Sequence, residues 1–504
     1  MKEHGGLILA LDLGTTACKA GVFNCRGNML SSSYIEYPLV RLDAGFIEQD
    51  AEDWWRVSLN ALMDAVSGLN SAVGKDAWKK IKAMSISAQG ISFLPVDGKG
   101  NPLRRAISWL DHRAEKEANE LKERLGADKF WQETGLPVHS VYTLPKILWL
   151  KRNEPEVVKK CQRFATSLDF LMQRFTGVPV TDHSVAAGTL MHLHNDLCWW
   201  KELLCELGIE YRKLPEVAWA GSKVYQIKPE IAKTIGVPED LQVVLGGHDQ
   251  ECAAIGAGLC KGRITVSMGT ASILIGSTDH PLYNPQRKIP SLPSVREGEW
   301  VLEAPVNVGG AALNWWKGIV GDQRLQNGSE VSYELLVEIA TNSPPGSKRV
   351  MFFPHMTGAT SPFWNTGVSG VFWGLTLSAG LPEMIRSVLE GWIYQINTNL
   401  VNFERLIGPI HEVVIFGGGA RSRFIARLLA DITGYKVQIP KTTETALLGA
   451  AIIAAEALYT GTDQAAMVSF GPTFIPDPGQ HLIYKKLYRQ YRTVEDQILK
   501  GEEE

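Results

Sequence analysis

The stretch Leu7-Ile-Leu-Ala-Leu-Asp12-Leu-Gly14-Thr15-Thr16-Ala-Cys-Lys19-Ala-Gly-Val-Phe23 decides the fold. The apolar run that ends at Asp12 predicts a buried strand, Gly14 and the two threonines predict a tight turn, and Ala20–Phe23 predicts a returning strand. Backbone N–H groups and hydroxyls in such a turn can bind phosphate oxygens, while Asp12 can hold Mg²⁺ and Lys19 can offset phosphate charge. An ordinary hairpin gives the same pattern, so this motif needs support from others.

A second stretch, Ile264-Thr-Val-Ser-Met-Gly269-Thr270-Ala-Ser-Ile-Leu-Ile-Gly276, repeats the plan about half a chain later. An apolar strand, a Gly-Thr turn and another strand favour a duplicated domain with one hairpin in each copy. Two such hairpins that face each other would bind a polyphosphate from both sides. Strand and helix patterns alternate along the first half, which indicates an α/β fold. Strands are expected at 29–40 and 81–87, and helices at 51–67 and 114–125.

The chain length predicts two domains. With 504 residues the chain exceeds the size that one hydrophobic core normally reaches. The stretch Gly246–Gly262 is rich in glycine and could carry a hinge, so the boundary is expected near Gly256. This divides the chain into an N-terminal domain at 1–255 and a C-terminal domain at 256–504, each with one hairpin.

Composition and charge exclude several classes of protein. The formal net charge is −3 and no block of Lys or Arg occurs, which argues against a nucleic-acid partner. No apolar stretch reaches the roughly 18 residues of a membrane span. The nearest, Leu447–Leu458, contains Glu456 and predicts a buried core helix. Seven scattered cysteines without a CxxC pair indicate reduced thiols and a cytoplasmic location.

A candidate base lies in Leu245-Gly246-Gly247-His248-Asp249-Gln250, where an apolar run meets a glycine pair and a helix of small residues. A carboxylate at this junction could accept the proton of a hydroxyl as its oxygen attacks a γ-phosphate. Phosphoryl transfer needs little more than this base, Mg²⁺ and positioning. The alternative is that Asp249 only caps the helix.

Two further motifs could hold small ligands. In Val413-Val-Ile-Phe416-Gly417-Gly418-Gly419-Ala420-Arg421-Ser422 a strand runs into three glycines, which let the backbone approach a flat group such as adenine. In a second region, Trp109 can stack on the apolar face of a sugar. Gln89, Asp111 and Arg113 can bind its hydroxyls there, although a core tryptophan beside an ion pair explains the same pattern.

Taken together, these motifs resemble the FGGY carbohydrate kinases, which have the actin/Hsp70/sugar-kinase superfold. The resemblance runs from about Leu7 to about Gly461. It includes Tyr142-Thr143-Leu-Pro-Lys146-Ile-Leu-Trp149 and Gly370-Val-Phe372-Trp-Gly374-Leu375 with Glu383, Ser387 and Glu390. It implies an α/β fold of two ribonuclease-H-like domains with a catalytic cleft between them. The first domain then carries the sugar site and the second the adenine site.

The family pattern assigns roles residue by residue. It makes Asp249 the general base and places Mg²⁺ at Asp12 and Asp249. ATP is expected at Asp12, Gly14, Thr15, Thr16, Lys19, Gly269, Thr270, Gly418, Gly419 and Ser422. The sugar is expected at Gln89, Gly90, Trp109, Asp111, Asp249 and Gln250. The resemblance also admits a homodimer and implies no nucleic-acid or membrane partner.

The chain departs from its relatives where specificity is set. Typical xylulokinases carry Met-His and typical glycerol kinases Arg-Glu where this chain has Gln89-Gly90. The layout around Trp109 resembles the xylulokinases, which implies ATP-dependent phosphorylation of a ketose such as xylulose or a related ketopentose. A kinase for a polyol, such as glycerol or erythritol, or for a sugar acid is an alternative within the family. A non-catalytic sensor that binds nucleotide and sugar is an alternative from another class.

Overall fold

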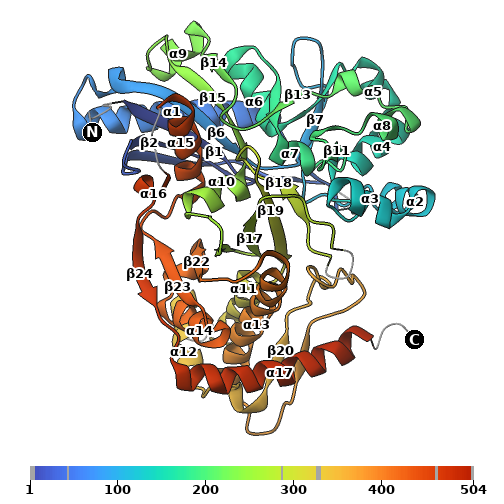
Figure 1. Ribbon diagram of the computed structural model, residues 1–504, viewed down its shortest axis with the longest axis vertical. Coiled ribbons are helices and arrows are strands. Elements are labelled where there is room, and N and C mark those ends of the chain that lie inside the picture. Colours follow the sequence, from blue (N-terminus) through green and yellow to red (C-terminus); the bar gives the residue numbers. More distant parts are fainter. Residues whose placement is uncertain (1–5, 43–44, 285–287, 325–330, 460–463, 501–504) are drawn as a thin grey trace.

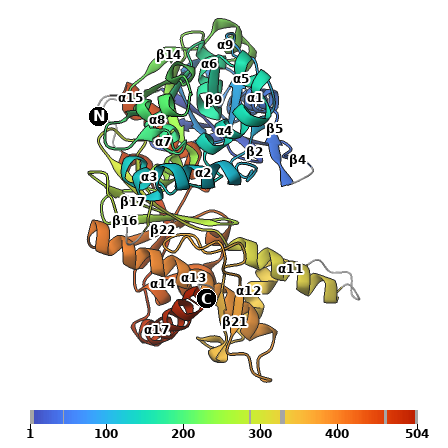
Figure 2. The same cartoon turned by 90° about the vertical axis from the view of Figure 1, so that its right-hand side faces the viewer.

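The computed structural model describes residues 6–42, 45–284, 288–324, 331–459 and 464–500. Two α/β halves lie one above the other, with the N-terminal half in blue and green and most of the C-terminal half in yellow to red (Figure 1). A view turned by 90° shows the same two layers of structure (Figure 2). Each half is built around a mixed β-sheet.

The sheet of the first half has the order β14-β15-β6-β1-β2-β3. β1 pairs antiparallel with β2 and parallel with β6, and β6 pairs parallel with β15. The hairpin predicted at the start of the chain is therefore confirmed. The strands are β1 (Leu7–Leu13), β2 (Ala17–Asn24), β3 (Met29–Glu36), β6 (Ile81–Ala88), β14 (Val224–Gln226) and β15 (Gln242–His248).

The sheet of the second half has the order β18-β19-β17-β16-β22-β23-β24. β16 pairs antiparallel with β17 and parallel with β22, and β22 pairs parallel with β23, as in the first sheet. The second predicted hairpin is confirmed, and the shared strand order supports a duplicated domain. The strands are β16 (Arg263–Met268), β17 (Ser272–Thr278), β18 (Ser291–Pro293), β19 (Trp300–Val306), β22 (Glu412–Phe416), β23 (Lys436–Pro440) and β24 (Phe470–Phe474).

Helices surround both sheets, and the two helices expected in the first half are confirmed as α1 and α2. α1 begins after Asp50, whose side chain accepts from the N–H of Glu52 and so caps the helix. The helices of the first half are α1 (Ala51–Val73), α2 (Glu115–Leu125), α3 (Ala127–Thr134), α4 (Thr143–Asn153), α5 (Pro155–Lys160), α6 (Ser167–Thr176), α7 (His183–Ala187), α8 (Lys201–Glu206), α9 (Pro229–Ile235) and α10 (Asp249–Gly256). Those of the second are α11 (Gly310–Arg324), α12 (Tyr333–Thr341), α13 (Leu381–Ile407), α14 (Arg423–Thr433), α15 (Thr445–Leu458), α16 (Gln464–Met467) and α17 (Pro478–Lys500).

A smaller sheet of five strands completes the first half. Its strands are β4 (Val40–Arg41), β5 (Ile47–Gln49), β8 (Ala106–Ile107), β7 (Phe93–Val96) and β9 (Arg163–Thr166), in that spatial order. The remaining strands form pairs: β10 (Val180–Asp182) with β13 (Glu216–Ala218), β11 (His192–Leu193) with β12 (Cys198–Trp199), and β20 (Met351–Phe353) with β21 (Val371–Trp373).

One helix of the second half packs on the first sheet. α15 is drawn in red among the blue strands of the first half (Figure 1). Side chains of β1 alternate between two core clusters: Leu9 and Leu11 lie with residues of α1, and Ile8 and Ala10 lie with residues of α15. Because successive side chains of a strand point to opposite faces, α1 and α15 cover opposite faces of this sheet. The predicted core helix is confirmed.

Two glycines bring α10 and α15 into close contact. A Cβ atom on Gly256 would overlap the carbonyl oxygen of Thr445, and one on Gly449 would overlap that of Cys252. The two parts of the sequence that meet near residue 256 are therefore joined in space by this helix pair. The expected boundary at 255/256 divides the sequence, whereas in space α15 packs on the N-terminal sheet.

No helix within the described ranges is long and apolar enough to cross a membrane.

Candidate active site

Three predicted site residues lie at one edge of the first sheet. β15, β6 and β1 are parallel neighbours. Asp12 lies near the end of β1, Gln89 follows β6, and Asp249 follows β15. Ligands of open α/β sheets bind outside the carboxyl ends of parallel strands. The topology therefore brings together residues that are more than 200 positions apart in the sequence.

Asp249 begins α10 directly after the strand. The N-cap position is occupied by His248, so Asp249 is the first residue of the helix rather than its cap. Burial raises the pKa of Asp249 to about 7, although the backbone N–H groups of Gln250 and Asp249 oppose the shift. A carboxylate with this pKa is suited to accept a proton near neutral pH. Gln250 is half-buried in the same turn.

Asp12 faces the same region. Its carboxylate accepts a hydrogen bond of 2.7 Å from the Ser87 hydroxyl on the neighbouring strand β6. Burial, followed by the charge of Asp249, raises the pKa of Asp12 to about 7. The mutual repulsion of the two carboxylates would be relieved by a cation, and carboxylate oxygens are the ligands that Mg²⁺ prefers.

The donor set also fits the way in which Mg²⁺ is usually bound. Among the described residues no group of three or more His, Cys, Asp or Glu side chains is arranged to hold a metal ion. Mg²⁺ is commonly held by one or two carboxylates together with phosphate oxygens and water. Asp12 and Asp249 provide such a pair.

The turn at residues 14–16, where phosphate binding is predicted, is held by hydrogen bonds to its backbone. The Gly14 N–H donates to the Ala17 carbonyl at 3.0 Å, and the Gln49 amide donates to the Thr15 carbonyl at 2.7 Å. The Tyr37 hydroxyl donates to the Gly14 carbonyl. These bonds fix the backbone of the turn, and the side chain of Thr16 is left exposed.

Lys19 does not act as a free cation in this structure. Its ammonium group lies 2.6 Å from the carboxylate of Glu444, just before α15. This pair ties the first hairpin to α15, and the expectation that Lys19 offsets phosphate charge stays a prediction. The partners are 425 positions apart, so no local pattern could have indicated the pair.

The second phosphate turn is supported by residues that sequence reasoning missed. Gly269 and Thr270 are exposed, as a phosphate site requires. The N–H groups of Gly309 and Gly310 donate to the carbonyls of Thr270 and Gly269 at 3.1 and 3.0 Å. A Cβ atom on Gly310 would lie 2.6 Å from the Gly269 carbonyl oxygen, so glycine is needed for this approach. The Gly309-Gly310 pair at the start of α11 was the available signal.

The three glycines after β22 differ in their surroundings. Gly417 has a φ of +87°, which favours glycine. A Cβ atom on Gly418 would meet no atom within 4 Å, whereas one on Gly419 would lie 2.8 Å from the ring of Trp392. Gly418 therefore borders open space, and Gly419 allows close packing. The Ser422 hydroxyl accepts from the Ile425 N–H at 3.3 Å and caps α14.

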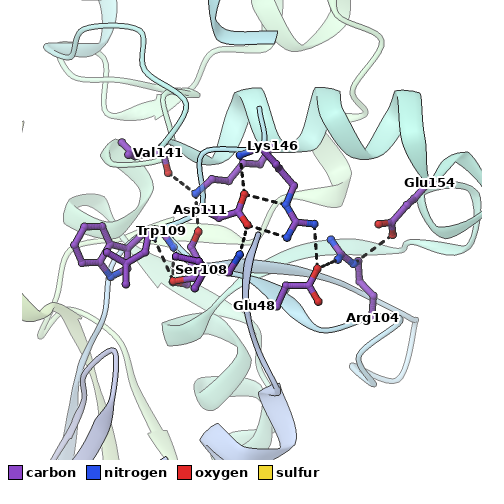
Figure 3. A network of polar contacts seen from close by, with 12 residues as sticks. Glu48, Arg104, Ser108, Trp109, Asp111, Val141, Lys146 and Glu154 are labelled. Atoms are coloured by element: carbon purple, nitrogen blue, oxygen red, sulfur yellow. Dashed lines mark hydrogen bonds and ion pairs between the residues drawn. The ribbon is translucent and has the colours of Figure 1, made fainter. Parts of the chain in front are cut away.

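Trp109 meets the requirements for a sugar-binding wall. Its side chain is partly exposed, and its indole N–H donates to the Thr15 hydroxyl at 2.9 Å. Its backbone N–H donates to the Ser92 hydroxyl at 3.0 Å. In Figure 3 the ring points away from the polar network behind it. Trp109 thereby links the predicted sugar site to the first phosphate turn.

Asp111 is turned away from the predicted sugar site. Its carboxylate accepts from the Arg113 guanidinium at 2.8 and 2.9 Å and from the Ile47 N–H at 2.6 Å. Arg113 in turn pairs with Glu48 at 3.0 Å, as the network in Figure 3 shows. Asp111 is fully buried, and its pKa is lowered because these donors outweigh its burial. Its expected contact with the sugar is corrected: Asp111 holds the segment that carries Trp109.

Gln89 is likewise directed into the protein. Its amide donates to Gln49 at 3.1 Å and to Tyr37 at 3.3 Å, and its carbonyl accepts from the Ser92 hydroxyl at 3.2 Å. The expected sugar contact of its side chain is therefore corrected to a supporting role, because Ser92 holds the backbone of Trp109. Gly90, the next residue, lies opposite His248.

Glu303 is an acidic residue of the site that the sequence did not reveal. It lies on β19 of the second half, and its Oε2 atom is buried without a hydrogen-bond partner among the described residues. Burial raises its pKa, and the charge of Asp249 raises it further. The acidic groups near Asp249 thus come from both halves of the chain. Only the strand pattern of 300–306 hinted at an inward-facing carboxylate.

Comparisons with known proteins identify the family of the chain. Residues 7–256 match the N-terminal domain of the FGGY family of carbohydrate kinases, and residues 264–458 match its C-terminal domain. A gluconokinase from Bacillus subtilis (strain 168) is 29% identical over 88% of this chain and 86% of that protein. A xylulose kinase from Staphylococcus xylosus is 27% identical over 97% of this chain and 99% of that protein.

A solved structure agrees equally well with the fold. The ligand-bound xylulose kinase from Lactobacillus acidophilus superposes with a TM-score of 0.90 at 27% identity, over 98% of this chain and 99% of that one. The two domain matches together cover most of the sequence, in the order expected. The chain belongs to the FGGY family of carbohydrate kinases and is a phosphotransferase enzyme.

Proposed function

We propose that the protein transfers the γ-phosphate of ATP to a hydroxyl of a neutral sugar, namely a ketose such as xylulose or a related ketopentose. One observation carries the proposal: Asp249 begins a helix at the carboxyl edge of the first sheet, where its charge acts on both Asp12 and Glu303 of the second half. A base in this position serves hydroxyl activation. The negative charge around it favours an uncharged acceptor.

The relatives support this class of acceptor. The xylulose kinase from Staphylococcus xylosus covers nearly the whole of this chain, and kinases of the family use ATP as phosphate donor. The proposed location is cytoplasmic, in keeping with seven cysteines that show no CxxC pattern.

In the proposed mechanism, Asp249 accepts the proton of the acceptor hydroxyl. The hydroxyl oxygen forms a bond to the γ-phosphorus as the bond between that phosphorus and the β,γ-bridging oxygen breaks, which leaves ADP. Gly14, Thr16, Gly269 and Thr270 bind the phosphates, and Trp109 orients the sugar by stacking. Mg²⁺ held at Asp12 and Asp249 would neutralise charge on the phosphates.

A sugar-acid kinase is the second candidate, and it rests on the gluconokinase from Bacillus subtilis, which is 29% identical. A carboxylate on the sugar would have to lie near Asp12, Asp249 and Glu303, and like charges in a buried site repel strongly. Lys19 does not compensate, because it is paired with Glu444. These charges favour the neutral acceptor.

The test is ADP release with Mg·ATP against a matched panel: D-xylulose, D-ribulose and L-xylulose as ketoses, glycerol and erythritol as polyols, and D-gluconate as the sugar acid. We expect one ketose to give a kcat/KM at least about tenfold above that of gluconate. A preference for gluconate would overturn the neutral-sugar assignment. No turnover with any acceptor, by a folded protein that binds ATP, would overturn the proposed reaction.

A further inference from the structure

The imidazole of His248 occupies the space directly beside Gly90. A Cβ atom built on Gly90 would lie 2.5 Å from Nε2 and 2.6 Å from Cδ2 of His248. Side-chain atoms do not approach each other this closely, so a side chain at position 90 and the imidazole at its present place exclude each other. The imidazole of His248 thus fills the space that a side chain at position 90, just after β6, would occupy.

The direction of the imidazole is fixed by its backbone. The His248 N–H donates to the Ser184 hydroxyl at 3.0 Å, and that hydroxyl donates to the buried Asp182 carboxylate at 2.6 Å. His248 pairs with Ala88 at the end of β15. A side chain at Gly247 would overlap Val295 of the second half, which packs against this backbone. The residue is therefore held from three directions.

The ring itself lies beside the reacting group. Its Nε2 atom is 3.4 Å from the Asp249 carboxylate, and its side chain is 20% exposed, which leaves part of the ring accessible to a ligand. Glu303 of the second half acts on it electrostatically. An imidazole offers a hydrogen-bond donor and an acceptor, and a sugar hydroxyl can pair with either.

We propose that His248 is a specificity-determining residue: its imidazole binds the sugar hydroxyl next to the one that Asp249 activates, and Gly90 is required to make room for it. The proposal rests on the proposed function and deepens it. Sites that hydrogen-bond a substrate hydroxyl discriminate strongly against analogues that lack it. His248 and Gly90 would thereby set which acceptor the enzyme selects.

The kinetic test is a double-mutant cycle of His248→Ala and Gly90→Ala on the acceptor that the wild type prefers. Each single substitution should lower kcat/KM for the sugar by about tenfold or more, as the loss of one hydrogen bond predicts, and should leave the KM for ATP unchanged. The double variant should lose no more than His248→Ala alone, because Gly90→Ala acts by displacing the ring. His280→Ala, at an exposed histidine, is the matched control.

The ratio of kcat/KM values for different acceptors shows whether His248 sets specificity or only positions Asp249. With His248→Ala, we expect the preference between the acceptor and its epimer or deoxy analogue at the neighbouring hydroxyl to shrink. An equal fall in kcat for all acceptors, with their ratio unchanged, would mean that His248 only positions the base and would overturn the proposal. Additive losses in the cycle would do the same.

A binding measurement separates this proposal from the proposed reaction. The protein contains 11 histidines, and ¹³C-histidine labelling with His248→Ala as the assignment variant identifies the His248 signal. We expect D-xylulose, added without nucleotide, to move this signal and to leave that of His280 in place. A His248 signal that none of the panel sugars moves would overturn the proposal, whether or not turnover is seen. Absence of turnover alone would overturn only the proposed reaction.

Discussion

At the scale of single residues, the two carboxylates at the sheet edge are the physical reason for proposing a cation there. Asp12 is buried and Asp249 is largely buried, and the charge of Asp249 raises the pKa of Asp12. Raised pKa values mean that folding favours the protonated forms. The stability that these groups contribute is present below their unfolded pKa and is lost as pH rises through about 7.

The repulsion between the ionised carboxylates of Asp12 and Asp249 predicts that a neutral residue at position 12 stabilises the protein. In metal-free buffer at about pH 8, Asp12→Asn should raise the melting temperature by about 2 °C or more, because it removes the repulsion and retains an acceptor for Ser87. Asp240→Asn, at an exposed site, should leave it nearly unchanged. Calorimetric scans compare the variants. A lower melting temperature for Asp12→Asn would contradict the proposed repulsion.

The same pKa values predict the pH dependence of activity. The base must be deprotonated, so kcat/KM measured at low Mg·ATP should fall about tenfold per unit as pH drops below about 7. At saturating Mg·ATP, Mg²⁺ held by Asp12 and Asp249 would favour their ionised forms, so the apparent pKa of kcat should be lower. Steady-state rates between about pH 5 and 9 test this. A flat kcat/KM profile for an enzyme that stays folded would exclude Asp249 as the base.

At the scale of elements, the close crossing of α10 and α15 supports the helix that begins with Asp249, the proposed base. Gly449→Ala would push a methyl group against the Cys252 carbonyl. We expect a loss of about 1–3 kcal/mol in the free energy of unfolding and a lower kcat, because α10 begins with Asp249. Gly318→Ala on α11 is the control, since a Cβ atom there meets nothing within 4 Å. Equal stability of the two variants would refute the close crossing.

The segment around Trp109 depends on α4. Lys146 is fully buried, and its amine donates to the carbonyls of Ser108 and Val141 at 2.7 Å each, as Figure 3 shows. Burial lowers its pKa to about 7. The residue before Trp109 is thus anchored to the helix by one side chain.

Lys146→Met should therefore affect sugar binding more than nucleotide binding. It removes the ammonium group that joins the carbonyls of Ser108 and Val141. We therefore expect the KM for the sugar to rise about fivefold or more while the KM for ATP changes little. Lys151→Met is a matched control, because Lys151 on the same helix also donates to two carbonyls, at 2.5 and 2.8 Å, away from Trp109. If both variants raise the KM for the sugar equally, the anchoring role is wrong.

At the scale of the whole molecule, the sequence predicted those elements that depend on interactions between residues close together in the chain. The two hairpins, the helix after Asp249 and the core helix near the end of the chain follow from apolar runs, glycine turns and small residues, and all are present. The family resemblance predicted the two-domain fold. The matches of residues 7–256 and 264–458 to the two domains of the family confirm it.

The remaining features depend on contacts between distant parts of the chain. The pair Lys19–Glu444 and the approach of Glu303 to Asp249 join residues that no sequence window contains together. Gln89 and Asp111 are polar residues in site motifs, and only their partners show that they point inward. The packing of α15 on the first sheet is likewise set by tertiary burial.

The most direct test of the central claim is single-turnover phosphoryl transfer by Asp249→Asn with the preferred acceptor and γ-labelled ATP. We predict a loss of about 10²–10⁴-fold in the transfer rate with ATP affinity within about twofold of the wild type, because the base acts on the acceptor hydroxyl. Near-normal transfer by this variant would contradict the account, since another group would then have to accept the proton.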